Sequence, residues 1–333
     1  PEARALCEFV LSKKDIQLVL LLGQHDLLVE KHKTVSSDGQ SEGGIPAPGI
    51  LEDDDALLVE IGKRWTKISS QPVKGDTDFA GSFEAWCYAQ RGLLTVAVKP
   101  WAIPFDDKQS KDEDKAGSQP EKDAPAGDAG VDAGGKAPEE EPSKQSKEAE
   151  KPEPSDDAKR LAWIDAHPDE LARFLPWAPF QHPELGALEI GGFAPYGLLE
   201  PPATRRGELT GEVFELLLAL EGMLARVSII DAKIRELAPG LIEVEAAVVN
   251  ESFLPLLGAA GRRARTLRGA KIELFLPKDA TLLAGNRQQL LFDLEGSGGR
   301  REYRWLVQGG SIHAIGVGVS TDHAGSARYL ETK

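Results

Sequence analysis

The 333-residue sequence lacks the marks of several protein classes. No apolar run approaches the ~18 residues that a membrane-spanning helix needs, so we expect no membrane span. Basic residues are outnumbered 39 to 54, and the net charge of −15 argues against nucleic acid as a partner, which requires a basic face. The two cysteines, Cys7 and Cys87, lie in helix-like apolar patterns and are expected to be buried free thiols; a disulfide would require Cα atoms within ~7 Å. This leaves the redox compartment open.

The length is sufficient for two domains of ordinary size. The sequence begins at Pro1 rather than at a methionine, and we interpret it as a fragment or processed product. No targeting signal can therefore be read from its start.

The first 105 residues combine helical and strand-like patterns, which is typical of an α/β fold. The apolar run Ile16 to Leu22 predicts a central parallel strand buried on both faces, and Leu93 to Val98 predicts a second buried strand. Residues 31–55, which include the acidic cluster Asp53-Asp54-Asp55, are predicted to be a loop. Helices are predicted near residues 5–10 and 57–65, and from the capping residue Ser82 to about Gln90, with Gly92 as the stop.

Residues 106–158 differ from the rest of the chain. They contain 17 acidic and eight basic side chains, no aromatic residue and, apart from alanines, one aliphatic residue, Val131. Such a segment buries too little apolar surface to offset its chain entropy, so we predict a disordered insert. A solvated spacer is the simpler interpretation, and an acidic docking segment is the alternative.

In the remaining chain, the sequence pattern changes at Ala225 from helical spacing to short strand-like segments. Residues 159–224 predict a short helix, an aromatic-rich turn and a second helix from about Glu212 to Met223, which would complete the α/β domain. Residues 225–333 predict an antiparallel β-sandwich, because short strand-like segments follow one another with glycine-bearing turns. These segments are Val227–Ile230, Leu241–Val249, Lys271–Leu276, Gln289–Leu294, Arg301–Val307 and Ser311–Val319.

Three stretches together carry a family resemblance. They are Pro1 to Leu6 leading to the strand Val19 to Leu22; Gly81 to Tyr88 leading to Val96 to Trp101; and Trp177 to Gly186. In this order they resemble the bacterial carboxypeptidase A-like zinc metallocarboxypeptidases. The resemblance implies a mixed sheet flanked by helices. It also implies a zinc-binding histidine at the end of the first strand, and a catalytic glutamate two residues before Trp101.

This sequence departs from the family at both positions. Gly23 stands at the histidine position and Lys99 at the glutamate position. A lysine ammonium about 5 Å from a divalent zinc, at an effective dielectric of ~20, would be repelled by roughly 6 kcal/mol. It also cannot accept the proton of metal-bound water. We therefore expect zinc binding to be weak or lost, with His25 as the alternative metal ligand and Lys99 as a non-functional catalytic position.

Other polar residues are interpreted as structural. His167 and Glu170 fit His-x-x-Glu, but Pro168 makes this a helix start, whereas the family's own pair lies upstream of Pro1. The same structural interpretation applies to His182, Glu184, His313 and His323. The basic run Arg262, Arg263, Arg265 and Arg268 is either a solvated loop or an anion-binding patch, for example for the acidic insert.

The sequence thus predicts part of a carboxypeptidase-like α/β domain, an acidic insert and a β-sandwich. The leading function is a non-hydrolytic family relative with a peptide-binding or scaffold role, whose partners would be the carboxyl termini of peptides or proteins. One alternative is an active zinc carboxypeptidase with its remaining ligands upstream; another is an interaction module in which the β-sandwich acts. The resemblance implies an extracytoplasmic location. Substrate and oligomeric state stay open.

Overall fold

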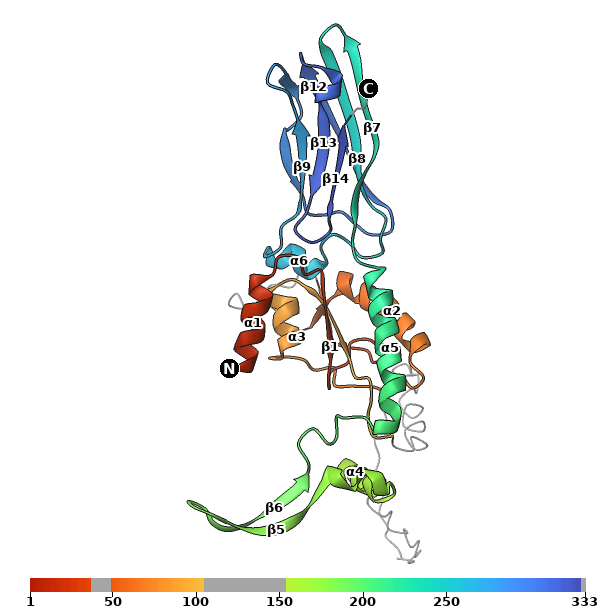
Figure 1. Ribbon diagram of the computed structural model, residues 1–333, viewed down its shortest axis with the longest axis vertical. Helices are drawn as coiled ribbons and strands as arrows, with labels where there is room; N and C mark the ends of the chain where they lie inside the picture. The colour runs from red at the N-terminus through yellow and green to blue at the C-terminus, as the bar shows by residue number, and fades with distance from the viewer. Residues whose placement is uncertain (37–48, 105–153, 331–333) are drawn as a thin grey trace, which may run out of the picture. The chain divides into compact units, whose positions relative to one another are not determined.

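The computed structural model describes residues 1–36, 49–104 and 154–330. These residues form two compact units. One contains the described residues of Pro1–Ala102 and Leu199–Lys333, and the other contains those of Ile103–Leu198. The first unit comprises an α/β part and a β-sandwich (Figure 1). Among the described residues, no helix is long and apolar enough to cross a membrane.

The α/β part is built on two parallel strands, β1 (Leu18–Leu22) and β4 (Leu94–Val98). Their register runs from Leu18 opposite Leu94 to Leu22 opposite Val98, which confirms the predicted parallel pair. All five residues of β4 are buried, as predicted. The prediction of a central strand is wrong for β1, which pairs only with β4 in the described part of the chain and leaves Leu22 51% exposed.

Four helical segments surround this pair of strands. Ser82 Oγ accepts a hydrogen bond from the Ala85 amide at 3.1 Å, and Gly92 ends the segment in a left-handed conformation (φ 65°), as predicted. Figure 1 shows β1 between α1 on one side and α5 on the other. The segments are α1 (Glu2–Ser12), α2 (Glu52–Ile68), α3 (Phe83–Ala85) with its π-helical continuation (Trp86–Gln90), and α5 (Ala203–Glu221).

The predicted loop over residues 31–55 is wrong near both of its ends. Two short strands, β2 (Thr34–Val35) and β3 (Ile50–Leu51), pair in parallel there, and residues 37–48 lie outside the described residues. Helix α2 begins at Glu52, so the cluster Asp53-Asp54-Asp55 forms its first turn. Carboxylates are stabilised at this position by the unpaired amides and the positive end of the helix dipole.

The predicted insert overlaps a helix at its end. Residues 105–153 lie outside the described residues, but Asp156 begins helix α4 (Asp156–Asp165). Ser155 caps this helix, because its Oγ accepts a hydrogen bond from the Ala158 amide at 3.3 Å. Disorder is therefore a wrong prediction for residues 156–158, where a capping serine followed by two aspartates favours a helix start.

The second unit continues into a β-hairpin that the sequence did not suggest. A 3₁₀ helix (Pro168–Arg173) leads into β5 (Phe174–His182), which pairs antiparallel with β6 (Gly186–Phe193). The predicted aromatic-rich turn is thus a strand. Two prolines within β5 hid this strand in the sequence. Proline has no backbone N–H to donate to a neighbouring strand, so a strand tolerates it only where that position donates no hydrogen bond.

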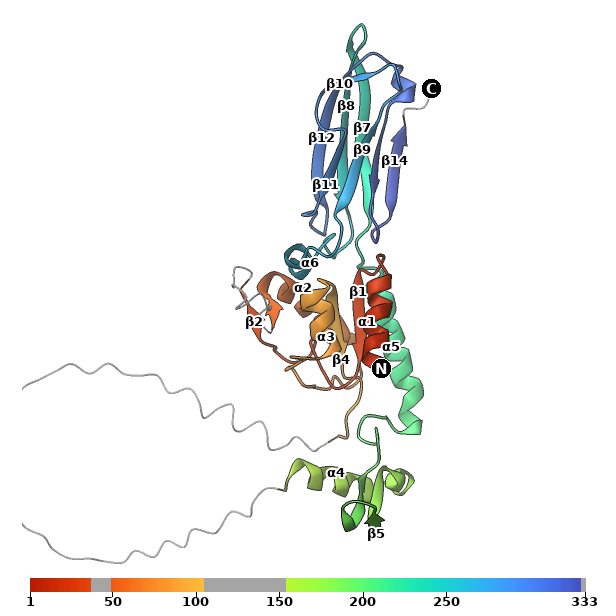
Figure 2. The same ribbon diagram turned by 90° about the vertical axis from the view of Figure 1, so that its left-hand side faces the viewer.

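The β-sandwich consists of two four-stranded antiparallel sheets, in the orders β10-β12-β8-β7 and β11-β9-β13-β14. Figure 2 shows the sheets face to face, and a shared core that includes Val244, Ile272, Trp305 and Val317 lies between them. The predicted β-rich region is confirmed. Its strands are β7 (Val227–Ala238), β8 (Leu241–Asn250), β9 (Ala270–Phe275), β10 (Thr281–Ala284), β11 (Gln288–Leu291), β12 (Gly299–Gln308), β13 (Gly316–Ser320) and β14 (Ser326–Leu330).

A short helix, α6 (Ala259–Ala264), lies between β8 and β9 in the sequence and packs against the α/β part. The buried carboxylate of Asp54 accepts hydrogen bonds from the amides of Ala259 and Ala260 at 2.7 and 2.9 Å. The Tyr88 hydroxyl donates a third bond to Asp54 at 2.8 Å. The first turn of α2 therefore fixes the first turn of α6.

Candidate functional site

The two positions that the sequence singled out are neighbours. The Gly23 amide donates a hydrogen bond to the Val98 carbonyl at 3.1 Å, so Gly23 lies beside Lys99 at the carboxyl ends of β1 and β4. In open α/β sheets, ligands bind beyond this edge of parallel strands. We call this place the strand-end site and define it by Gly23, His25 and Lys99.

Gly23 faces open space. A Cβ atom built on it meets no atom within 4 Å, and its backbone is not in the left-handed region. The site therefore has room for a larger side chain at this position, and the glycine is not explained by packing. Its only chemical effect here is the absence of a side chain that can bind a ligand.

His25 is held by a carboxylate. Its Nδ1 lies 3.0 Å from Glu84 Oε1 in α3, and the two side chains are 25% and 12% exposed. Burial alone would raise the pKa of Glu84. This effect is outweighed by hydrogen bonds from its own backbone amide, His25 and Ser82, which together lower that pKa. The imidazole thus contacts Glu84 through Nδ1 and is one of the groups that lower its pKa.

The loop that carries His25 is fixed by the next residue. The buried Asp26 carboxylate accepts hydrogen bonds from the amides of Leu28, Val29 and Glu30 at 2.9 to 3.1 Å. Sequence reasoning missed both Asp26 and Glu84. An aspartate just past a strand end is a signal for such a turn, because its side chain bonds the amides that follow. Glu84 gave no comparable signal.

The strand-end site lacks two of the groups that the resemblance implies for a zinc centre. In the residues that the structure describes, no three His, Cys, Asp or Glu side chains gather as metal ligands would. Gly23 offers no ligand atom, and Lys99 brings a positive charge to the same edge. The residues present therefore do not fit the zinc ion that the resemblance implies.

Of the other histidines that the sequence singled out, three have a hydrogen-bond partner and His313 is exposed. His167 precedes the 3₁₀ helix, stacks on Trp163 at 4.2 Å and bonds the Trp163 carbonyl through Nδ1 at 2.7 Å, while Glu170 pairs with Arg173. His167 and Glu170 thus face different partners, in agreement with a helix start. His182 Nδ1 accepts bonds from the amides of Glu184 and Leu185. His323 bonds the Leu256 carbonyl at 3.0 Å, and His313 is exposed in a 3₁₀ turn.

The basic run lies partly in a helix. Arg262 and Arg263 belong to α6 rather than to a loop, while Arg265 and Arg268 follow the helix.

Cys7 is half-buried and Cys87 is buried, and both are free thiols. Burial, together with the charges of Cys7 and Glu84, raises the pKa of the Cys87 thiol to about 12.

Comparison with known proteins bears on the sandwich alone. Residues 226–329 match a family described as a domain of unknown function, DUF8731. This segment corresponds to the two antiparallel sheets, from the start of β7 into β14. No curated protein matches the chain.

Proposed function

We propose that this protein is a non-hydrolytic peptide-binding protein, with an α/β part related to zinc carboxypeptidases, that holds peptide carboxyl termini at the strand-end site. The observation that carries the proposal is the hydrogen bond from the Gly23 amide to the Val98 carbonyl, next to Lys99. The resemblance requires the histidine and glutamate positions to lie together. The parallel pairing of β1 with β4 meets that requirement.

The proposed chemistry follows from the charges at this edge. With Gly23 and Lys99, the site loses one metal ligand and exchanges a negative charge for a positive one. A cation at the end of a parallel strand suits a terminal carboxylate, with which lysine forms a charge-assisted hydrogen bond. The same cation opposes zinc and cannot act as the base that activates water.

The active-enzyme alternative needs different geometry. His25 would have to serve as the zinc ligand two residues after Gly23, through Nε2, while its Nδ1 keeps Glu84 Oε1 at 3.0 Å. The Lys99 ammonium would also have to lose its proton or turn from the metal. That change at Lys99 has an energetic cost, so we favour the non-hydrolytic function.

The test compares one peptide in two forms. The full-length protein is titrated with a peptide that ends in a free carboxylate and with the same peptide ending in an amide. We expect the amide to bind at least ~10-fold more weakly, because a charge-assisted hydrogen bond contributes about 1.5–3 kcal/mol. In Lys99→Met this preference should vanish.

A matched variant controls for general loss of positive charge. Lys278→Met removes an exposed lysine of the sandwich and should keep the preference for the free carboxylate. Equal binding of acid and amide to the unmodified protein would refute the proposal. Release of the terminal residue during the titration would favour the enzyme instead.

A further inference from the structure

The sandwich contains a cavity of about 830 Å³ that has no part in the strand-end site. This volume falls within the roughly 300–1,000 Å³ that is typical of small-molecule sites. We call it the basic cavity and define it by its lining residues, of which one is acidic. They are Gly261, Arg262, Arg265, Leu267, Arg268, Gly269, Lys271, Leu290, Phe292, Ser320, Thr321 and Asp322.

Two of the four cationic side chains that line the cavity have no ion-pair partner among the described residues. Arg262 pairs with Asp53 and Glu295, and Lys271 pairs with Glu273. The side chains of Arg265 and Arg268 are exposed and make no hydrogen bond or ion pair with any residue that the structure describes. Guanidinium groups bind carboxylates and similar oxyanions in two-pronged geometry. The rim thus offers two free anion-binding groups.

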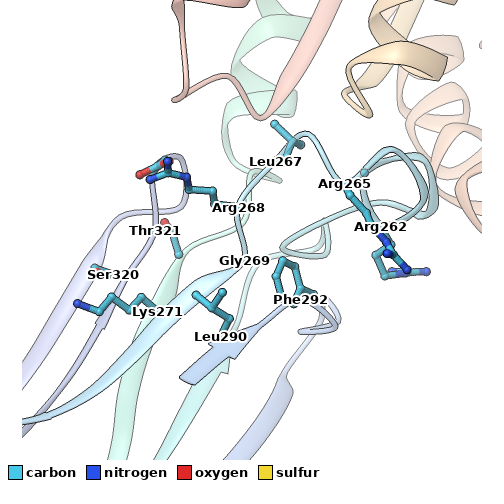
Figure 3. Close-up of a pocket in the computed structure, with 12 residues that line it drawn as sticks. Arg262, Arg265, Leu267, Arg268, Gly269, Lys271, Leu290, Phe292, Ser320 and Thr321 are labelled. Atoms are coloured by element: carbon cyan, nitrogen blue, oxygen red, sulfur yellow. The ribbon is translucent and has the colours of Figure 1, made fainter. Parts of the chain in front are cut away.

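The floor of the cavity is apolar. Leu290 in β11 is 59% exposed and Phe292, the first residue after β11, is 44% exposed, whereas Leu291 between them lies in the core. Figure 3 shows these two side chains between Lys271 on one side and Arg262 and Arg265 on the other. Large apolar side chains exposed beneath a polar rim mark a binding site more often than a plain surface.

The loop that carries the free arginines is held in place. A Cβ atom on Gly269 would come within 2.4 Å of the Leu291 carbonyl oxygen, so glycine permits the loop to lie directly on β11. At the other end, α6 rests on the α/β part, where a Cβ on Gly92 would approach the Gly261 Cα atom to 2.7 Å. The cations are therefore presented from a fixed backbone, which lowers the entropy cost of binding.

From these observations we infer that the basic cavity binds a small amphiphilic anion, with its carboxylate on one of the two exposed arginines of the rim, Arg265 or Arg268, and its apolar chain on Leu290 and Phe292. A bare inorganic anion would leave the apolar floor exposed to water. A neutral apolar molecule would leave the two guanidinium groups without a partner. Only a ligand that carries both features satisfies the whole site.

The experiment titrates the full-length protein with decanoate, below its micelle-forming concentration, by isothermal titration calorimetry. We expect saturable binding of one decanoate at this site. The Arg265→Ala/Arg268→Ala double variant and the Phe292→Ala variant should each weaken that binding at least ~10-fold, since each removes one half of the recognition. All substituted side chains are exposed, and unchanged melting temperatures would confirm intact folding.

Two variants and one ligand serve as controls. Arg287→Ala removes an exposed arginine outside the cavity, and Leu283→Ala removes a leucine that is 49% exposed on β10; both should bind decanoate normally. Decyltrimethylammonium has the same chain with a cationic head and should not compete. The inference is overturned if no saturable binding occurs, if the cation binds equally well, or if the arginine variants bind like Arg287→Ala.

Discussion

Asp54 Oδ1 lies 2.7 Å from the amide nitrogen of Ala259, a residue 205 positions later in the chain. This contact ties the first turn of α2 to the first turn of α6. Because the carboxylate is 1% exposed and also accepts bonds from Ala260 and Tyr88, each of its donors would be left buried without it. Asp54 is therefore one of the side chains that couple the β-sandwich to the α/β part.

Asp54→Ala should lower the free energy of unfolding by about 3 kcal/mol. Each buried donor left without an acceptor costs roughly 1–3 kcal/mol, and the three donors to Asp54 are adjacent, so their costs do not add in full. Urea denaturation measures this change. The neighbouring Asp53→Ala is the matched control, since Asp53 is exposed and only approaches Arg262 at 3.5 Å, and it should change stability by no more than ~0.5 kcal/mol. Equal effects of the two substitutions would contradict the assigned role.

Gly258→Ala should destabilise the protein by about 1–3 kcal/mol, because the new Cβ would lie 2.7 Å from Asp54 Oδ1 and that carboxylate cannot move without losing its donors. Gly211→Ala is the comparison. No atom lies within 4 Å of its added Cβ and it is exposed within α5, so we expect a gain of about 0.5–1 kcal/mol from helix propensity. Thermal unfolding of both variants measures the difference. A neutral Gly258→Ala would show that the α2–α6 contact is loose.

Glu84 should make stability depend on pH. Its folded-state pKa is lowered from the ordinary 4.5, so its contribution is fully present above pH 4.5 and is lost as the pH falls through the lower folded value. Glu84→Gln should therefore destabilise the protein by about 1 kcal/mol near neutral pH, and the difference from the unmodified protein should shrink in acid. Glu215→Gln, an exposed glutamate on α5, should show no such trend. A difference that stays constant from pH 7 to acid would contradict the lowered folded-state pKa of Glu84.

Cys87 should resist alkylation. With a pKa of about 12, its thiolate fraction at pH 8 is about a thousandfold below that of an ordinary thiol of pKa ≈ 8.5. Mass spectrometry after iodoacetamide treatment should show no modification of Cys87 in the native protein and full modification in urea. Rapid native alkylation would mean that the thiol is not buried as described.

The sequence predicted those elements whose patterns are local and continuous. The parallel strands near Leu20 and Val96, the capped helix at Ser82 and the β-rich region after Ala225 all follow from apolar runs, a capping residue and period-two alternation. It also pointed to Gly23 and Lys99, which the structure places side by side.

Other features depend on partners far along the chain. No local pattern shows that Asp54 is buried by α6. Nor does any show that β1 pairs with one strand in the described part of the chain, where a two-sided apolar run suggests two. The hairpin β5–β6 was hidden by prolines, and the basic cavity forms only when α6 is brought against β11 and β13. Such features arise from tertiary contacts, which override local propensity.

The central claim is that Gly23 and Lys99 leave the protein without hydrolytic activity. The most direct measurement is zinc-dependent, chelator-sensitive release of the terminal residue from a peptide by the unmodified full-length protein. We predict release at the background rate, with or without added zinc, since loss of a general base alone costs ~10²–10⁴-fold. The Gly23→His/Lys99→Glu variant, for which position 23 has room, provides the comparison. Robust release by the unmodified protein that a chelator abolishes would contradict the account and indicate His25 as the zinc ligand.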